Sequence, residues 1–226
     1  KKHNIPVTAT AMGIGCMHKD DPYYIGPIGC LGVGSSNSLS KDTDLALAVG
    51  TKLGDFTTGS WTNFQNPEFK LVSINAARFD VTKHRAIPVI SDAKVGLQEL
   101  SNLLGEWKAP NAWYERAIKE AKDWDQYVEK QSGPTNQELP SYAHAIGAVY
   151  RNADPSDVIV TAAGGLVGEA VQIWKPKGLN TFETEWGFSC MGYEISGALG
   201  MKMAKPNQDI IVFIGDGSYL LQNSDI

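Results

Sequence analysis

The residues best suited to chemistry lie near the C-terminal end, where Gly215, Asp216 and Gly217 follow the apolar run 210–214. This run is too short for a helix and too continuous for a half-exposed strand, so it predicts a buried strand of a parallel sheet. Ligands bind at the carboxyl ends of such strands, and an Asp between two glycines places a hard carboxylate beside backbone that a phosphate can approach closely. The alternative is a tight turn in which Asp216 only caps the next helix.

A second glycine-rich connection has the same character. Residues 157–161 predict another buried strand, which leads directly into Ala163, Gly164 and Gly165. A helix that begins near Leu166 would direct its free N–H groups and the positive end of its dipole at a ligand over the two glycines, as helix starts do when they bind phosphate. The alternative is that Gly164 and Gly165 form a plain turn.

A third connection contains Ser189 and Met191 and precedes a predicted helix at residues 192–204. Three glycines in this helix each cost roughly 1 kcal/mol relative to Ala at an exposed position, which predicts close packing against another backbone or a ligand. Met191 alone is equally typical of an ordinary core residue. Because three neighbouring connections of one sheet all end in small residues, we expect a single ligand site there.

The elements that must position these connections follow a β/α pattern along the chain. In the first half we expect strands at residues 6–10, 44–50, 70–75 and 86–90, a glycine-rich loop at 26–34, and an amphipathic helix at 93–104. This order is typical of a parallel α/β sheet. In the second half a helix at 141–152, capped by Ser141, precedes the strand at 157–161.

The middle of the chain predicts a surface helix. One stripe of it is apolar and charged residues surround that stripe, which comprises Trp113, Ala117, Ala121, Trp124 and Val128. The breaker-rich residues 132–137 then indicate an interdomain linker. We therefore expect an α/β protein with two doubly wound, Rossmann-like domains at 1–108 and 138–226, the second truncated, joined by a helical linker at 109–137.

The composition excludes several classes of protein. The net charge of -5 argues against general nucleic-acid binding, and no apolar run among the 226 residues approaches the length of a membrane span. The 3 cysteines and 4 histidines are scattered, which disfavours a zinc site or a disulfide framework and fits a reducing cytoplasm. Since the chain begins without Met and stops soon after the Gly-Asp-Gly turn, we expect a fragment of a longer protein.

These segments together resemble a known enzyme superfamily. Residues 157–165, 188–193 and 212–218 resemble the diphosphate-binding domain of thiamine-diphosphate-dependent enzymes of the acetolactate synthase type, and residues 26–29, 44–55, 74–75 and 89–93 look like the central domain of that superfamily. Residues 185–195 and 215–224 look closest to the trihydroxycyclohexane-1,2-dione hydrolases of myo-inositol catabolism. The resemblance covers nearly the whole chain.

The resemblance implies roles for particular residues. Asp216 would ligate a Mg²⁺ that bridges the cofactor's diphosphate, and Gly217 and Ser218 would give backbone N–H groups to the same diphosphate. Gly215 would belong to the same cofactor-binding motif. The opposite side of the diphosphate would be lined by Ala163, Gly164, Gly165 and Leu166. Met191 would hold the two cofactor rings in a bent shape. Ser189 stands where acetolactate synthases commonly have Gly, but the family's contact there uses the backbone carbonyl, so the role stays open.

The resemblance also implies an activity, namely thiamine-diphosphate-dependent hydrolysis of a carbon–carbon bond that opens trihydroxycyclohexane-1,2-dione to 5-deoxyglucuronate. The Glu that activates the cofactor belongs to an N-terminal domain in this family, so no catalytic residue is assigned and the 226 residues alone are expected to be inactive. A small-molecule substrate, a homodimer or homotetramer and a cytoplasmic location are expected.

Two alternatives remain open. One keeps the superfamily but makes the protein a lyase or synthase of 2-keto acids. The other is a non-catalytic nucleotide-binding module that would use Gly29, Gly32 and Gly34, although their spacing departs from Gly-x-Gly-x-x-Gly.

Overall fold

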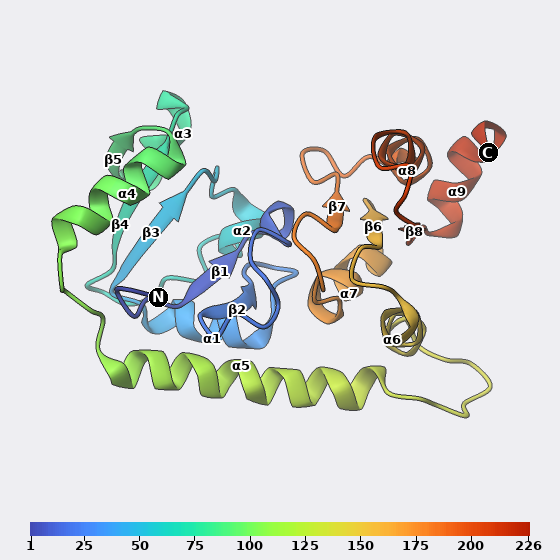
Figure 1. Cartoon of the computed structure of the whole chain (residues 1–226), viewed down its shortest axis with the longest axis horizontal. Coiled ribbons are helices and arrows are strands. Elements are labelled where there is room, and N and C mark those ends of the chain that lie inside the picture. The colour runs from blue at the N-terminus through green and yellow to red at the C-terminus, as the bar shows by residue number, and fades with distance from the viewer.

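The computed structural model describes all 226 residues and contains two α/β units connected by a long helix (Figure 1). The first unit comprises β1 (Val7–Ala9), η1 (Ala11–Gly13), β2 (Tyr24–Pro27), α1 (Gly34–Asp42), β3 (Leu45–Val49), α2 (Asp55–Thr58), β4 (Lys70–Asn75), α3 (Arg78–Val81), η2 (Lys83–Arg85), β5 (Ile87–Ile90) and α4 (Ala93–Leu104). Its strands form a parallel β1–β2 pair and a parallel sheet of order β3-β4-β5. The expected parallel α/β arrangement is therefore confirmed.

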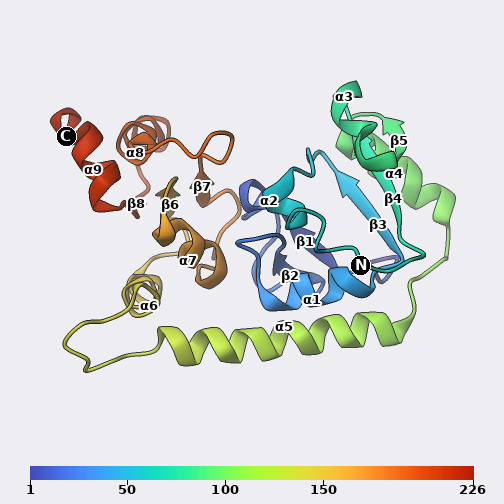
Figure 2. The ribbon, with the colours of Figure 1, turned by 180° about the vertical axis from the view of Figure 1, so that it is seen from behind.

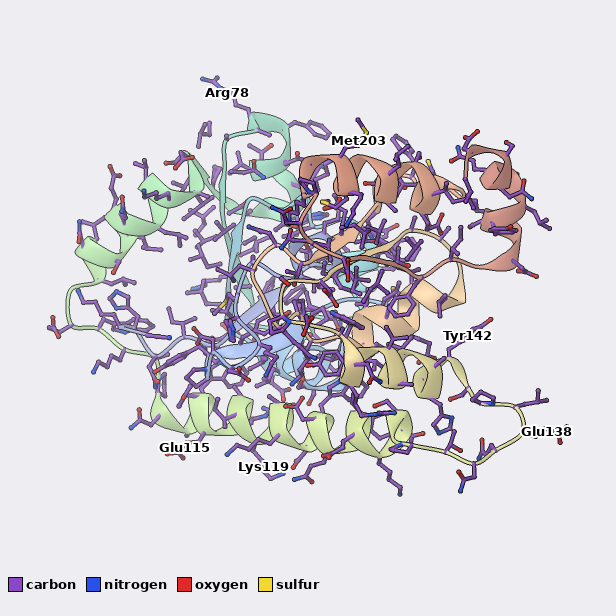
Figure 3. All side chains as sticks on the ribbon, turned by 45° about the vertical axis from the view of Figure 1, so that its right-hand side comes forward. Arg78, Glu115, Lys119, Glu138, Tyr142 and Met203 are labelled. Atoms are coloured by element: carbon purple, nitrogen blue, oxygen red, sulfur yellow. The ribbon has the colours of Figure 1, made fainter.

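Helix α5 (Asn111–Ser132) runs beneath both units, as seen from either side (Figures 1 and 2). It packs against α1 and β2 of the first unit and against α6 and α7 of the second. The predicted apolar stripe faces these partners, with Ala117 fully buried. Glu115 and Lys119 point outward from the helix (Figure 3). The amphipathic pattern thus explains how one face of this helix packs against both units.

The second unit comprises α6 (Tyr142–Asn152), β6 (Val158–Thr161), α7 (Gly165–Ile173), β7 (Phe182–Thr184), α8 (Tyr193–Ala204), β8 (Ile210–Val212), α9 (Asp216–Gln222) and η3 (Asn223–Asp225). The strands form a parallel sheet of order β7-β6-β8, in which α8 lies on the opposite side of β6 from α6 and α7 (Figure 1). Every residue of β6 is fully buried. Its Ile159 belongs to the largest hydrophobic cluster, which contains 11 buried residues.

Helix ends form where the sequence predicts them. Asp92 begins α4 by accepting hydrogen bonds from the backbone N–H groups of Lys94 and Val95 at 2.9 and 3.1 Å. Ser141 caps α6, as predicted, by accepting from the N–H of His144 at 3.3 Å. These caps satisfy N–H groups that the first turn of a helix leaves free.

Several expectations were wrong in detail. Residues 24–27 are strand β2, although the sequence predicted a loop from residue 26, because pairing with β1 overrides the turn tendency of Gly26 and Pro27. Gly26 adopts φ +98°, and the register of the pair shifts beside it. Strand β3 is confirmed, whereas β8, which was predicted to be buried, is only half-buried. A strand at residues 182–184, β7, was not expected at all.

The two units also touch directly. Ile14, from the first unit, is part of the hydrophobic cluster of the second, and Gly15 accepts a backbone hydrogen bond from Asn180 at 3.1 Å. The rings of Phe56 and Trp186 meet edge to face with centroids 5.4 Å apart.

No helix combines the length and the apolar character needed to cross a lipid bilayer.

Candidate functional site

Three connections of the second sheet come together at the carboxyl ends of β6 and β8 and at the start of α8. They are residues 162–165, 188–192 and 215–218. Adjacent parallel strands place these connections side by side, since β6 pairs with both β7 and β8. The predicted convergence of the three connections on one edge of the sheet is therefore observed.

The first connection leads into α7, which begins at Gly165, close to the predicted start at Leu166. Gly164 occupies the N-cap position with φ +87°, a conformation that favours glycine, and a Cβ at this residue would meet nothing within 4 Å. Gly164 and Gly165 are exposed, whereas Ala163 is 7% exposed and Leu166 is half-buried. The start of α7 thus presents free backbone N–H groups toward open space.

The second connection contains a residue in a strained conformation. Ser189 has φ +53°, which glycine adopts without strain and which costs another residue roughly 1–3 kcal/mol. Its hydroxyl donates to the carbonyl of Ala162 at 3.5 Å. Ser189 thus adopts a backbone conformation that favours glycine, the residue that the resemblance led us to expect here.

Glu185 holds this connection from one side. Its carboxylate accepts from the N–H groups of Phe188 at 2.9 Å and Cys190 at 2.7 Å. These bonds, that from Cys190 foremost, lower the pKa of Glu185 below its ordinary value. Glu185 is therefore ionised and holds the loop in place.

Tyr193 lies at the start of α8. Its pKa is raised mainly by burial and secondly by the negative charge of the nearby Glu183.

The third connection touches the second. A Cβ added to Gly217 would lie only 3.0 Å from Cε of Met191, so these two residues of the predicted site lie against each other. Met191 is nevertheless 51% exposed, which is unusual for a residue that serves only to fill a core. Its side chain lies over the start of α9 with a free surface still available to a ligand.

Asp216 is the first residue of α9, while the N-cap position is held by Gly215, so the alternative in which Asp216 is itself the cap is wrong. The carboxylate is exposed, and its Oδ1 accepts from the N–H of Gly217 at 2.8 Å. Ser218 is buried. No three His, Cys, Asp or Glu side chains gather into a metal-binding group. A cation here would thus be held by Asp216 together with a ligand of its own.

The glycines of the alternative nucleotide loop are packed by protein. A Cβ on Gly29 would lie 2.1 Å from the carbonyl oxygen of Phe56, and one on Gly34 would lie 2.8 Å from the ring of Trp124. A Cβ on Gly32 would lie 2.5 Å from the backbone nitrogen of Gly29. All three glycines allow close packing within the first unit, and Gly29 and Gly32 are buried.

Sequence reasoning missed Glu194, which is 0% exposed in the first turn of α8. Its carboxylate accepts from the N–H groups of Ala163 and Gly192, and so links the first two connections. A signal was available, since Glu194 is the only charged residue between positions 191 and 201. Within the glycine-rich helix, Gly192 and Gly197 pack against side chains of this chain and Gly200 faces open space.

The arrangement fits a diphosphate with a bound Mg²⁺. Two helix starts with open glycines, at Gly164 and Gly215, can donate backbone N–H groups to phosphate oxygens. Asp216 supplies the single hard oxygen ligand that suits a Mg²⁺ held mainly by phosphate and water. Met191 provides an exposed apolar surface beside them.

The chain is similar to curated proteins over its whole length. It is 35% identical over 250 residues to the 3D-(3,5/4)-trihydroxycyclohexane-1,2-dione hydrolase of Geobacillus thermodenitrificans, and 34% identical over 251 and 248 residues to the proteins of the same name from Clostridium tetani and Bacillus anthracis. These alignments cover 99–100% of the chain. The chain spans only 38–39% of the length of those relatives.

Two family descriptions match separate parts of the chain. Residues 1–100 match the thiamine pyrophosphate enzyme central domain, and residues 162–226 match the C-terminal thiamine-pyrophosphate-binding domain of the same enzymes. The second match contains the connections after β6, before α8 and after β8, where the candidate site lies. The chain therefore belongs to the thiamine pyrophosphate enzyme family, with its central domain in the first unit and its cofactor-binding domain in the second.

Proposed function

We propose that the full-length protein is a thiamine-diphosphate- and Mg²⁺-dependent hydrolase that opens the ring of trihydroxycyclohexane-1,2-dione by cleaving a carbon–carbon bond. The names of the relatives support the reaction. The observation that carries the proposal is the contact of Met191 with Gly217 between two open helix starts, because it provides phosphate donors, a metal ligand and an apolar surface together.

Each residue has a proposed role in holding the cofactor. Asp216 binds Mg²⁺, and the N–H groups of Gly217 and Ser218 bind the diphosphate beside it. The opposite side of the diphosphate is lined by Ala163, Gly164, Gly165 and Leu166. This division fits the exposed carboxylate of Asp216 and the open space over Gly164 and Gly215.

The second connection orients the rings of the cofactor. Met191 would support the rings with its exposed apolar side chain, and the carbonyl of Ser189, which has a left-handed backbone conformation, would accept a hydrogen bond from the aminopyrimidine. When bound, thiamine diphosphate supplies the electron sink for the breaking carbon–carbon bond. Water completes the hydrolysis, so that one carbonyl carbon of the dione becomes a carboxylic acid and the other an aldehyde. The residues of this chain bind and orient, and none is assigned a proton-transfer role.

Further features of the protein remain proposals. We place the domain boundaries at 1–108 and 138–226, with residues 109–137 as the connecting helical segment. We also propose a homodimer or homotetramer in the cytoplasm and a small-molecule substrate. Size-exclusion chromatography with light scattering checks the assembly.

The proposal is tested by Asp216→Ala in the full-length protein, with titration calorimetry of thiamine diphosphate in the presence of Mg²⁺. We expect affinity to fall by at least about 100-fold, since changes even to outer-shell partners of a metal cost 10–100-fold. Cleavage of the dione, followed as release of the acid, falls with it. Asp209→Ala is the matched control, because Asp209 lies before β8 with its side chain 87% exposed and outside the site.

Three results would contradict the proposal. The first is that the wild-type protein does not bind thiamine diphosphate. The second is that Asp216→Ala and Asp209→Ala bind it with equal affinity. Turnover of pyruvate without turnover of the dione would instead support the 2-keto acid alternative.

A further inference from the structure

We infer that Glu194 is a positioning residue, which fixes the two loops that would hold opposite ends of the cofactor. The inference rests on the proposed cofactor site. Glu194 lies in the first turn of α8 and is 0% exposed, so it touches neither solvent nor an open surface where a ligand would bind. Glu194 therefore affects the site through the hydrogen bonds that its carboxylate accepts from the surrounding backbone.

The two oxygens of this carboxylate serve different loops. Oε1 accepts from the N–H of Ala163 at 3.2 Å, at the end of β6. Oε2 accepts from the N–H of Gly192 at 3.0 Å, immediately after Met191. One rigid carboxylate thereby sets the distance between the phosphate-binding turn and the turn that carries Met191.

Electrostatics explain why a charge is retained in this position. A buried carboxylate is costly unless hydrogen bonds or opposite charges compensate for its lost hydration. Glu194 forms no ion pair with any Lys, Arg or His. Its compensation comes from the two charge-assisted bonds to N–H groups and from the positive end of the α8 dipole. Both depend on the loops staying in place, so the charge and the loop geometry stabilise each other.

The neighbouring backbone needs this support. Ser189 at φ +53° and Gly192 at φ +93° both stand in left-handed conformations on either side of Met191. Glu185 holds the front of the turn through Phe188 and Cys190, but it reaches one loop only. Glu194 is the carboxylate that connects this turn to Ala163. Its loss should change the cofactor site, while loss of Glu185 should loosen a single loop.

The test is Glu194→Gln in the full-length protein, with titration of thiamine diphosphate and Mg²⁺ as the first measurement. The amide retains one acceptor oxygen and turns an NH₂ donor against one backbone N–H, so one of the two loops is released. We expect affinity for the cofactor to fall roughly tenfold or more, as when residues that position a binding shell are changed. The KM for the cofactor rises accordingly, while kcat at saturating cofactor changes less.

Two control variants separate positioning from general loss of stability. Glu185→Gln should lower cofactor affinity less than Glu194→Gln does. Ile146→Val, in the buried face of α6, should lower the melting temperature without changing cofactor affinity. Failure of the wild-type protein to bind thiamine diphosphate would refute the proposed function itself. Binding by the wild type with equal affinity in Glu194→Gln would refute only the role of Glu194.

If Glu194→Gln does not fold, hydrogen exchange in the wild-type protein decides. The amides of Ala163 and Gly192 should exchange slowly without cofactor, because Glu194 already accepts from both. Rapid exchange of either amide in the cofactor-free protein would overturn the inference.

Discussion

The two units contain sheets of the same design, three parallel strands each, yet their edge strands are covered very differently. In the first unit all four residues of β5 are exposed, with Ile87 at 57% and Ile90 at 54%. In the second unit the edge strand β7 buries Phe182 to 6% and Thr184 to 3%. The more apolar strand, β5 (Ile-Pro-Val-Ile), thus lies at the surface, whereas β7 (Phe-Glu-Thr) is largely buried.

The difference arises from what the rest of the chain places on each sheet. Residues from four helices and from η1 pack around β6 and β7, so that Ile14 from the start of the chain joins the 11-residue cluster. The buried cluster of the first unit contains only 3 residues, of which Ala117 comes from α5. The candidate site projects from the better-buried sheet. Strands held by a dense core position loops more accurately than loosely covered strands do.

The largest expected effect is a direct test of this contrast. Ile159→Ala in β6 removes a side chain that is 0% exposed, and should lower the free energy of unfolding by about 2–5 kcal/mol. Ile87→Ala in β5, at 57% exposure, should lower it by less than about 0.5 kcal/mol. Urea denaturation of the full-length protein measures both. Equal losses would show that β5 is covered in solution and that the contrast does not hold.

Glycine substitutions should show the opposite order of sensitivity in the two units. The first unit is tightly packed around the loop that contains Gly29, whereas Gly200 of the second unit faces open space. Gly29→Ala places a Cβ 2.1 Å from the carbonyl oxygen of Phe56 at φ +115°, and should destabilise the protein by about 2–3 kcal/mol. Gly200→Ala in α8 meets nothing within 4 Å and should stabilise it by about 0.5–1 kcal/mol. Thermal unfolding of the two variants should shift in opposite directions. A stabilised Gly29→Ala would mean that this loop rearranges freely.

Local patterns allowed much of this fold to be predicted. The bounds of β4 and α4 agree with their apolar periodicity, and Ser141 caps α6 where a polar residue precedes the helix. The contact of Met191 with Gly217, and the position of Gly164 at the end of the neighbouring strand, followed from the rule that adjacent parallel strands end at one edge. Each of these features depends on residues close together in the chain or on one topological rule.

Features that depend on distant partners escaped prediction. Strand β2 forms because β1 pairs with it, and β7 because β6 does, while their own sequences contain turn residues or too few apolar ones. The exposure of β5 depends on which helices cover it, which periodicity does not reveal. The burial of Glu194 is compensated in part by a donor from Ala163, 31 positions away. Burial of a charge is a property of tertiary contacts and has no local pattern.

The smallest expected effect concerns Glu185, whose hydrogen bonds to Cys190 and Phe188 hold its pKa below the ordinary value of 4.5. A carboxyl group with a lowered folded-state pKa stabilises the fold above its unfolded-state pKa, and this contribution is lost as the pH falls through the lowered value. Glu185→Gln should therefore melt at a lower temperature than wild type at neutral pH, and the difference should shrink below pH 4.5.

Glu138→Gln, in the outer loop of Figure 3, is the matched control, because Glu138 is exposed and makes no hydrogen bond or ion pair. A constant difference between Glu185→Gln and wild type at every pH would mean that the turn before Met191 is held by its packing rather than by this charge. The conformation of the site would then be stabilised by packing on the buried sheet alone, without a contribution from the charge of Glu185.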